Sequence, residues 1–171
     1  MNLLDRFRRN RPPAEALRTL HPSDRLLAWA PTADGMLVAS RGGLRRPDGR
    51  FVPWHLIDKA VWRDAVLSIT EVSEVEPGVY EPRPESIFSL DEPGELPAVV
   101  RTRVTRSIAY SSHHLLPRRG GVRVVARRVP GQDGLAWSVR FDPGTDLADP
   151  GVREAADQLL ADARASATAS E

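Results

Sequence analysis

The chain has 171 residues, with 24 basic and 23 acidic side chains and no cysteine. This length suits one domain with short extensions, and the missing cysteine excludes disulfides, thiolate nucleophiles and metal sites built on sulfur. The formal net charge of +1 does not give the chain the overall basicity that is typical of nucleic-acid-binding domains.

The sequence predicts three parts: a helical extension over residues 1–20, a single α+β domain over 21–166, and a small polar tail over 167–171 that we expect to be disordered. The first ten residues carry an apolar stripe among arginines, which could lie on an anionic membrane or in a partner groove. Ten residues bury too little apolar area to hold a membrane alone, so we expect this segment to fold against its own domain or to be disordered. A second short helix is predicted over 14–20.

The first residues, MNLLDRFRRN, are already charged at position 5, and no long apolar run occurs anywhere in the chain. We therefore expect no signal peptide, no transmembrane segment and a cytoplasmic location. The absence of cysteine agrees with a reducing compartment.

Three successive β-hairpins are predicted in the first half of the chain, because short apolar runs alternate with turn residues. Gly42 and Gly43 allow a sharp corner before the second hairpin, and Asp64–Ala65 form the tight reversal of the third, with Trp62 pointing inward. The predicted strands cover residues 26–30, 36–40, 50–54, 57–63 and 66–72.

The run over residues 24–62, DRLLAWAPTADGMLVASRGGLRRPDGRFVPWHLIDKAVW, resembles bacterial members of the pleckstrin-homology-like group and is similar to proteins of high-GC Gram-positive bacteria. The resemblance is carried by a strand pair followed by Pro53, Trp54 and Ile57. It implies a bent antiparallel sheet or partial barrel capped by a C-terminal helix, and a scaffold that binds lipid headgroups, peptides or proteins. It implies no phosphoinositide site, because the loop PTADG carries an acid and no basic residue.

The acidic, proline-rich stretch over residues 73–97 is predicted to be mainly a loop with one short strand at 87–90. A helix is predicted over 97–106, since proline suits a first turn and apolar residues recur at every fourth position from Val100 to Ile108. The many β-branched residues leave a strand as the alternative for this segment. A helix here departs from the strand order that the resemblance implies.

A three-stranded antiparallel meander over residues 107–141 is the clearest pattern in the chain, because its last two strands alternate apolar and polar residues. A final helix is predicted from Asp149, as N-cap, and Pro150. Its apolar stripe should cover the sheet. The stripe consists of Val152, Ala156, Leu159, Leu160 and Ala163.

Charge is segregated along the chain. Between residues 70 and 97, Arg83 is the only basic residue among the acids Glu71, Glu74, Glu76, Glu81, Glu85, Asp91, Glu92 and Glu95. From residue 98 to 132 there are arginines and no acid. The two stretches could neutralise each other as neighbouring surfaces, or the basic one could bind an anion.

The predicted pairing in the meander identifies which arginines could bind an anion. If Val124 opposes Val139 on the buried face, Arg123 lies directly opposite Arg140 on the other face. Opposed like charges destabilise a sheet, so either acids of the 70–97 stretch cover this row or it binds an anionic partner. The candidate binding residues are Arg101, Arg103, Arg106, Arg123, Arg127 and Arg140.

No residue pattern predicts catalysis, a metal site or a cofactor. Ser111-Ser112 precede His113-His114, but adjacent residues of a strand point to opposite faces, so the two histidines cannot easily share a metal. The sequence RGGL at Arg41 lacks the lysine and the following helix that a phosphate loop needs. The four tryptophans are predicted to pack in the core.

These observations favour a non-enzymatic binding or protein-interaction module of unknown ligand that uses an arginine-rich sheet face. The alternative is a nucleic-acid or ribosome-associated protein that binds through residues 101–128. It is weakened by the low net charge and by the few aromatic residues among these arginines.

Overall fold

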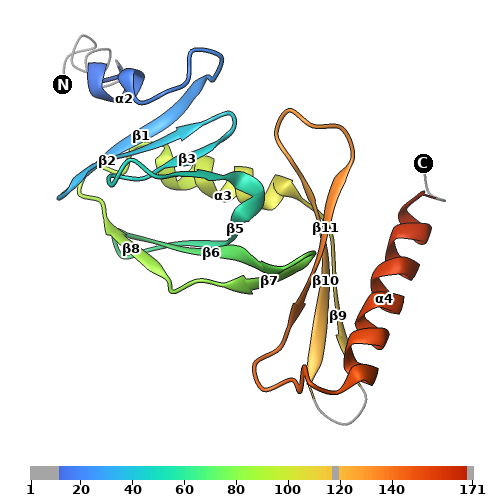
Figure 1. Cartoon of the computed structure of the whole chain (residues 1–171). Coiled ribbons are helices and arrows are strands. Elements are labelled where there is room, and N and C mark those ends of the chain that lie inside the picture. The colour runs from blue at the N-terminus through green and yellow to red at the C-terminus, as the bar shows by residue number, and fades with distance from the viewer. Residues whose placement is uncertain (1–11, 117–119, 169–171) are drawn as a thin grey trace.

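The computed structural model describes residues 12–116 and 120–168 (Figure 1). It confirms an α+β fold in which mostly antiparallel strands form a curled half-barrel sheet and a C-terminal helix packs on it. The predicted helix over the first ten residues lies outside the described ranges. The elements are α2 (Ala14–Arg18), β1 (Leu26–Thr32), β2 (Gly35–Ser40), β3 (Gly43–Arg45), β4 (Phe51–Pro53), η1 (Trp54–Leu56), β5 (Ile57–Arg63), β6 (Val66–Glu76), β7 (Val79–Pro82), β8 (Ser86–Ser89), α3 (Leu96–Ser107), β9 (Ile108–Leu115), β10 (Gly121–Arg128), β11 (Leu135–Phe141) and α4 (Pro150–Thr168).

Strands β1 to β4 form a four-stranded antiparallel sheet with strand order β1-β2-β3-β4. The predicted corner at Gly43 is a steric requirement, because a Cβ there would collide with the carbonyl oxygen of Val52 on β4. The Ser40 hydroxyl donates a 2.5 Å hydrogen bond to the Asp24 carboxylate, which ties the end of β2 to the segment before β1. The first two predicted hairpins are therefore confirmed.

The third predicted hairpin is also confirmed, since β5 pairs with β6 antiparallel. Its turn residues Asp64 and Ala65 both have positive φ, 50° and 62°, as a two-residue hairpin turn of this type requires. β6 continues to Glu76 and pairs with two further strands on its other side, first with β8 and then with β7.

Helix α3 confirms the helix predicted after the acidic stretch. Its residues Leu96, Val100 and Val104 are buried against β1, β5 and η1, whereas Ile108 is the first residue of β9 and is exposed. These helix residues belong to a cluster of buried apolar side chains that we call the first core. It consists of Ala28, Ala30, Leu37, Ala39, Leu44, Val52, Trp54, Ile57, Leu67, Ile69, Leu90, Leu96, Val100 and Val104.

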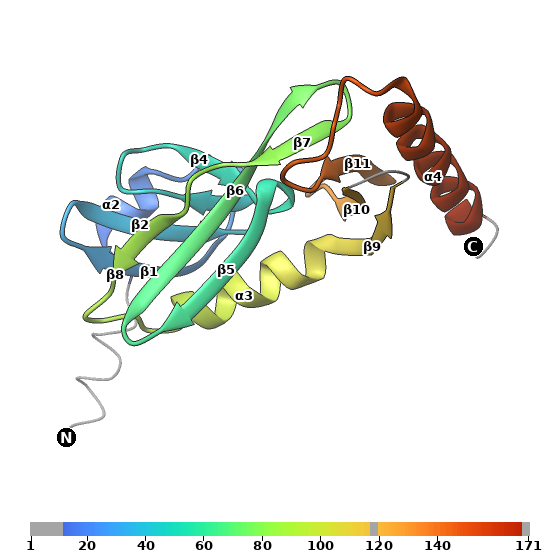
Figure 2. The same cartoon turned by 90° about the horizontal axis from the view of Figure 1, so that it is seen from below.

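The predicted meander is present as β9, β10 and β11, and α4 packs on one of its faces (Figure 2). A single parallel pair, Val139 with Val79, joins β11 to β7 and so connects the meander to the rest of the sheet. Figure 2 shows α3 running from the strands of the first half toward β9. The second core, between meander and α4, consists of Leu116, Val122, Val124, Val139, Val152, Ala156 and Ala163.

Two predictions about the middle of the chain were wrong. Residues 73–82 are not a loop, because β6 extends to Glu76 and β7 returns beside it. Trp62 does not point inward but is 39% exposed, whereas Trp54 is 2% exposed and donates its indole N–H to the Ser40 carbonyl. Trp62 lies on the same face of β5 as Ala60, which packs against the first core. It is nearer the end of the strand, where it borders a surface hollow with Arg101.

Helix α4 includes Ala167 and Thr168, the first two residues of the segment that was predicted as a tail. No helix within residues 12–116 and 120–168 is both long and apolar enough to cross a membrane.

Candidate functional site

The predicted arginine row lies on the face of the meander opposite to α4. Arg123 of β10 pairs in register with Arg140 of β11, as predicted, and Val124 pairs with Val139 on the face that α4 covers. His113 of β9 is the other neighbour of Arg123. The side-chain period of two in antiparallel strands places these residues on one face.

Asp58 of β5 is the carboxylate that approaches this row. One of its oxygens lies 2.7 Å from Arg140 and the other 3.6 Å from Arg127. Arg127 is only 7% exposed and also donates a 2.8 Å hydrogen bond to the Ser107 hydroxyl. Its burial lowers the guanidinium pKa, which Asp58 partly restores.

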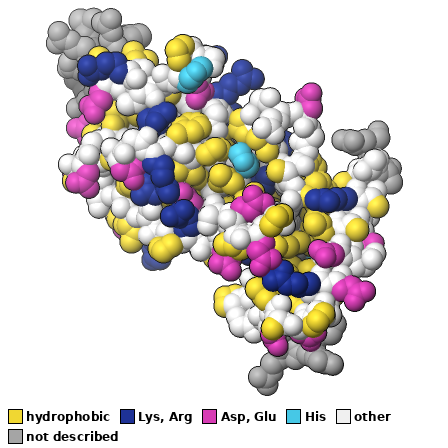
Figure 3. Space-filling model, viewed as in Figure 1, with side chains coloured by type: hydrophobic (Ala, Val, Ile, Leu, Met, Phe, Trp, Pro, Cys, Tyr) yellow, Lys and Arg dark blue, Asp and Glu magenta, His cyan; other side chains and the backbone are white. Residues whose placement is uncertain are grey.

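The acidic stretch therefore does not supply the carboxylate that neutralises the row, contrary to one of the two alternatives drawn from the sequence. The buried acid of this stretch, Glu71, instead forms ion pairs with Arg46 and Arg50. Glu76 forms a bidentate ion pair with Arg153 of α4, at 2.6 and 3.1 Å. Figure 3 shows acidic and basic side chains side by side over the surface formed by β7, β11 and α4.

The three arginines of α3 do not form one group. At 100° per residue, Arg103 and Arg106 lie on one flank of the buried stripe and Arg101 lies on the other. Arg101 borders a hollow with Trp62 of β5. Arg106 lies next to the meander, since Arg128 of β10 donates to the Arg106 and Ile108 carbonyls at 3.1 and 3.2 Å.

Arg103, Arg106 and Arg123 have no carboxylate partner within the described part of the chain. Among the described residues, the Arg123 guanidinium donates one hydrogen bond, to the Ser111 hydroxyl at 3.5 Å. Arg127 and Arg140 share Asp58, and Arg101 is set apart. The structure brings together only part of the predicted set.

The serine and histidine cluster is divided between the two faces of β9, as predicted. His114 pairs with Val122, on the face toward α4, and His113 pairs with Arg123. His113 Nε2 lies 2.7 Å from the Asp142 carboxylate, and this contact crosses Gly121, where a Cβ would collide with both groups. Among the described residues no group of three potential ligands could hold a metal ion.

A buried ion cluster of Arg46, Glu71 and Arg50 was missed in the sequence. Glu71 is 6% exposed and accepts hydrogen bonds from Arg46, at 2.6 Å, and from Arg50. Arg46 also donates to the Ser86 hydroxyl of β8, at 3.0 Å. The cluster therefore joins the β3–β4 turn to β6 and β8. Only the fold brings together residues that lie more than twenty positions apart, and no local pattern marks them.

His55 belongs to the short helix η1. Its Nδ1 atom is buried and has no hydrogen-bond partner among the described residues. Burial, and secondarily the charge of Arg127, lowers the His55 pKa. Both effects favour the neutral form of the ring.

Comparisons with protein-family models, with curated proteins and with solved structures found no match. The pleckstrin-homology-like assignment remains a prediction.

Proposed function

We propose that this protein is a non-enzymatic interaction module that binds an acidic segment of a partner protein through the arginine surface, defined as Arg103, Arg106, Arg123 and Arg140. One observation supports this proposal above others: Arg123 and Arg140 are adjacent, and Asp58, which binds Arg140, is shared with Arg127. The row keeps an excess of positive charge that a partner carboxylate can offset.

The position of the aromatic side chains favours an acidic peptide over single-stranded nucleic acid. Tyr110 and Trp137 pack against each other, with ring centroids 5.6 Å apart, and belong to the second core on the α4 side of the meander. Neither ring can stack on bases bound at Arg123, whereas proteins that bind single strands combine basic and aromatic side chains in one groove.

The test uses the double variant Arg106→Gln/Arg123→Gln, which leaves both arginine partners of Asp58 in place. We expect it to weaken binding of a fluorescent decaglutamate peptide about tenfold or more, since hydrogen bonds to charged groups are the stronger ones. Fluorescence anisotropy at increasing salt gives the affinities, which should fall as salt screens the charges.

The control variant Arg25→Gln/Arg41→Gln removes two exposed arginines that flank the β1–β2 hairpin, outside the meander and α3, and should bind the peptide as the wild type does. Equal weakening in both variants would reduce the effect to net charge and contradict the proposal. If a single-stranded RNA oligonucleotide bound more tightly than the peptide and with a steeper salt dependence, the result would contradict the peptide proposal and support the nucleic-acid alternative.

A further inference from the structure

Strand β8 has a free backbone edge. It pairs with β6 and with no other strand in the described part of the chain. The Leu90 N–H donates to the Ala65 carbonyl at 2.9 Å, which fixes the phase of the ladder. In an antiparallel pair every second residue directs its N–H and C=O to the partner, so Ser86 and Phe88 bond to β6. Ile87 and Ser89 direct theirs to the open side.

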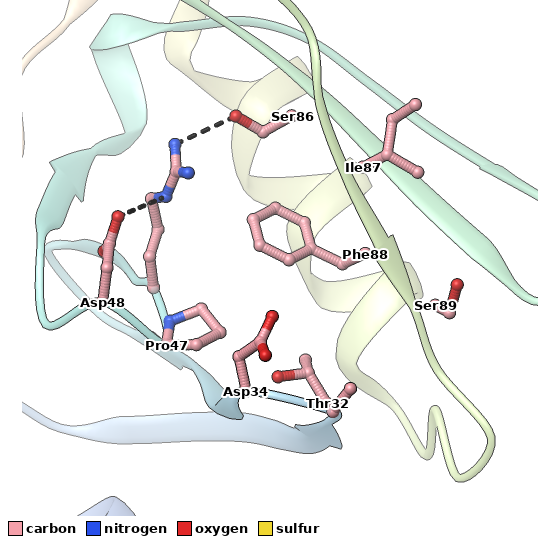
Figure 4. A pocket seen from close by; sticks show the side chains of 10 residues that line it. Thr32, Asp34, Pro47, Asp48, Ser86, Ile87, Phe88 and Ser89 are labelled. Carbon is pink, nitrogen blue, oxygen red and sulfur yellow. Dashed lines mark hydrogen bonds and ion pairs between the residues drawn. The ribbon is translucent and has the colours of Figure 1, made fainter.

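A hollow of about 450 Å³ lies along this edge. It is bordered by the β1–β2 turn, by the β3–β4 turn and by all four residues of β8. Figure 4 shows the Phe88 ring pointing into the hollow and the Ile87 side chain pointing away from it. Ile87 is 65% exposed. A peptide segment beside β8 would therefore have two different surroundings. On the walled side it would face the hollow, which the two turns border, and on the other side it would lie beside the exposed Ile87 side chain.

The walled side carries two exposed acids, Asp34 and Asp48. Asp34 of the β1–β2 turn is exposed and has no ion-pair partner among the described residues, and Asp48 of the β3–β4 turn lies opposite. Arg46, the cation among the residues that border the hollow, forms an ion pair with Asp48 at 3.5 Å and also binds Glu71 and Ser86. Asp34 is therefore the acid of this wall that keeps its charge unpaired within the described ranges. The Thr32 hydroxyl at the same wall is buried and has no hydrogen-bond partner within the described ranges. Buried hydroxyls normally have one.

We propose that this edge binds an extended peptide segment of a partner protein, with basic side chains at alternate positions. The segment would add a strand to β8 through the N–H and C=O groups of Ile87 and Ser89. Its side chains would alternate between the two sides, because the period of a strand is two. Basic side chains would face Asp34 and Asp48, and apolar ones would lie beside Ile87.

Charge complementarity selects this occupant over a second copy of the same edge. Glu85 directly precedes β8, and Asp91 and Glu92 follow it closely, all exposed. Two such edges would bring like charges together, which is a common device against edge-to-edge pairing. A basic strand would meet opposite charge at both ends of β8.

The probe is a fluorescein-labelled octapeptide of alternating valine and arginine, measured by anisotropy. We expect saturable binding, whereas an octapeptide of alternating valine and glutamate should not bind. Asp34→Asn should weaken the affinity about three- to tenfold. Asp133→Asn, which removes an exposed acid from the β10–β11 turn, should leave it unchanged. The Arg106→Gln/Arg123→Gln variant should also bind normally, so this inference and the proposed function can fail separately.

Backbone pairing is tested by Ile87→Pro, which removes one N–H from the open edge and none from the ladder with β6. It should abolish binding, and Ile87→Thr, which keeps the N–H, should retain it. N-methylation of alternate peptide residues gives the same test without altering the protein. Binding that survives both changes, or equal binding of the glutamate peptide, would overturn the proposal. So would a peptide-free dimer in sedimentation velocity that Ile87→Pro dissociates.

Discussion

Burial and a neighbouring arginine make His55 a residue whose protonation opposes folding. The fold lowers its pKa, so the unfolded chain binds this proton more tightly than the native protein does. The stabilisation by the neutral ring is complete above the unfolded pKa of about 6.5 and is lost as the pH falls through the lower, folded pKa.

We therefore expect the free energy of unfolding, measured in urea, to decrease between pH 7.5 and 5, and to decrease less in His55→Gln. His21→Gln is the control, since His21 is exposed and contacts only Ser23. If wild type and His55→Gln change in parallel over this range, His55 does not oppose folding by its protonation.

At the scale of elements, α4 owes its position to its apolar stripe. Val152, Ala156 and Ala163 are buried against the meander, and Leu160 packs against the same cluster while partly exposed. Leu160→Asp would place a carboxylate in this contact. We expect a loss of about 1–3 kcal/mol in the free energy of unfolding, because an unpaired charge replaces apolar contact.

The matched control for the helix is Ala161→Asp, which introduces the same side chain on the exposed side of α4. It should cost only the lower helix propensity of aspartate, about 0.5 kcal/mol. Equal stabilities of the two variants in urea unfolding would show that Leu160 does not hold the helix on the sheet.

At the scale of the whole molecule, Asp58 joins the part of the fold around the first core to the meander. Asp58 belongs to β5, next to the first core, and binds two arginines of the meander. Asp58→Asn would leave Arg127 buried without a carboxylate. Since Asp58 is itself a quarter exposed, we expect a loss of about 1–3 kcal/mol.

Asp64→Asn provides the comparison, because the Arg63–Asp64 pair is almost fully exposed and should contribute very little. Asparagine also tolerates the positive φ of that turn. Unchanged stability of Asp58→Asn would mean that β7 and the packing of α3 alone hold the two cores together.

The sequence by itself determined most of the local structure. The meander, its register at Arg123 and Arg140, the helix before it and the stripe of α4 all follow from periodicities of two and 3.6 residues, which short segments display completely. The turn at Asp64–Ala65 was equally local. The loop predicted from residue 73 onward was wrong. Acids and prolines are typical of loops, but here β7 is stabilised by pairing with β6.

Only the tertiary structure decided which charges are free. Asp58 lies 69 positions before Arg127 and 82 before Arg140, so no spacing rule could join them. The Arg46–Glu71–Arg50 cluster and the open edge of β8 likewise arise where segments distant in sequence meet. The physical reason is that ion pairing depends on distance in space and on burial, whereas the amino-acid pattern records only which face of its own element a residue occupies.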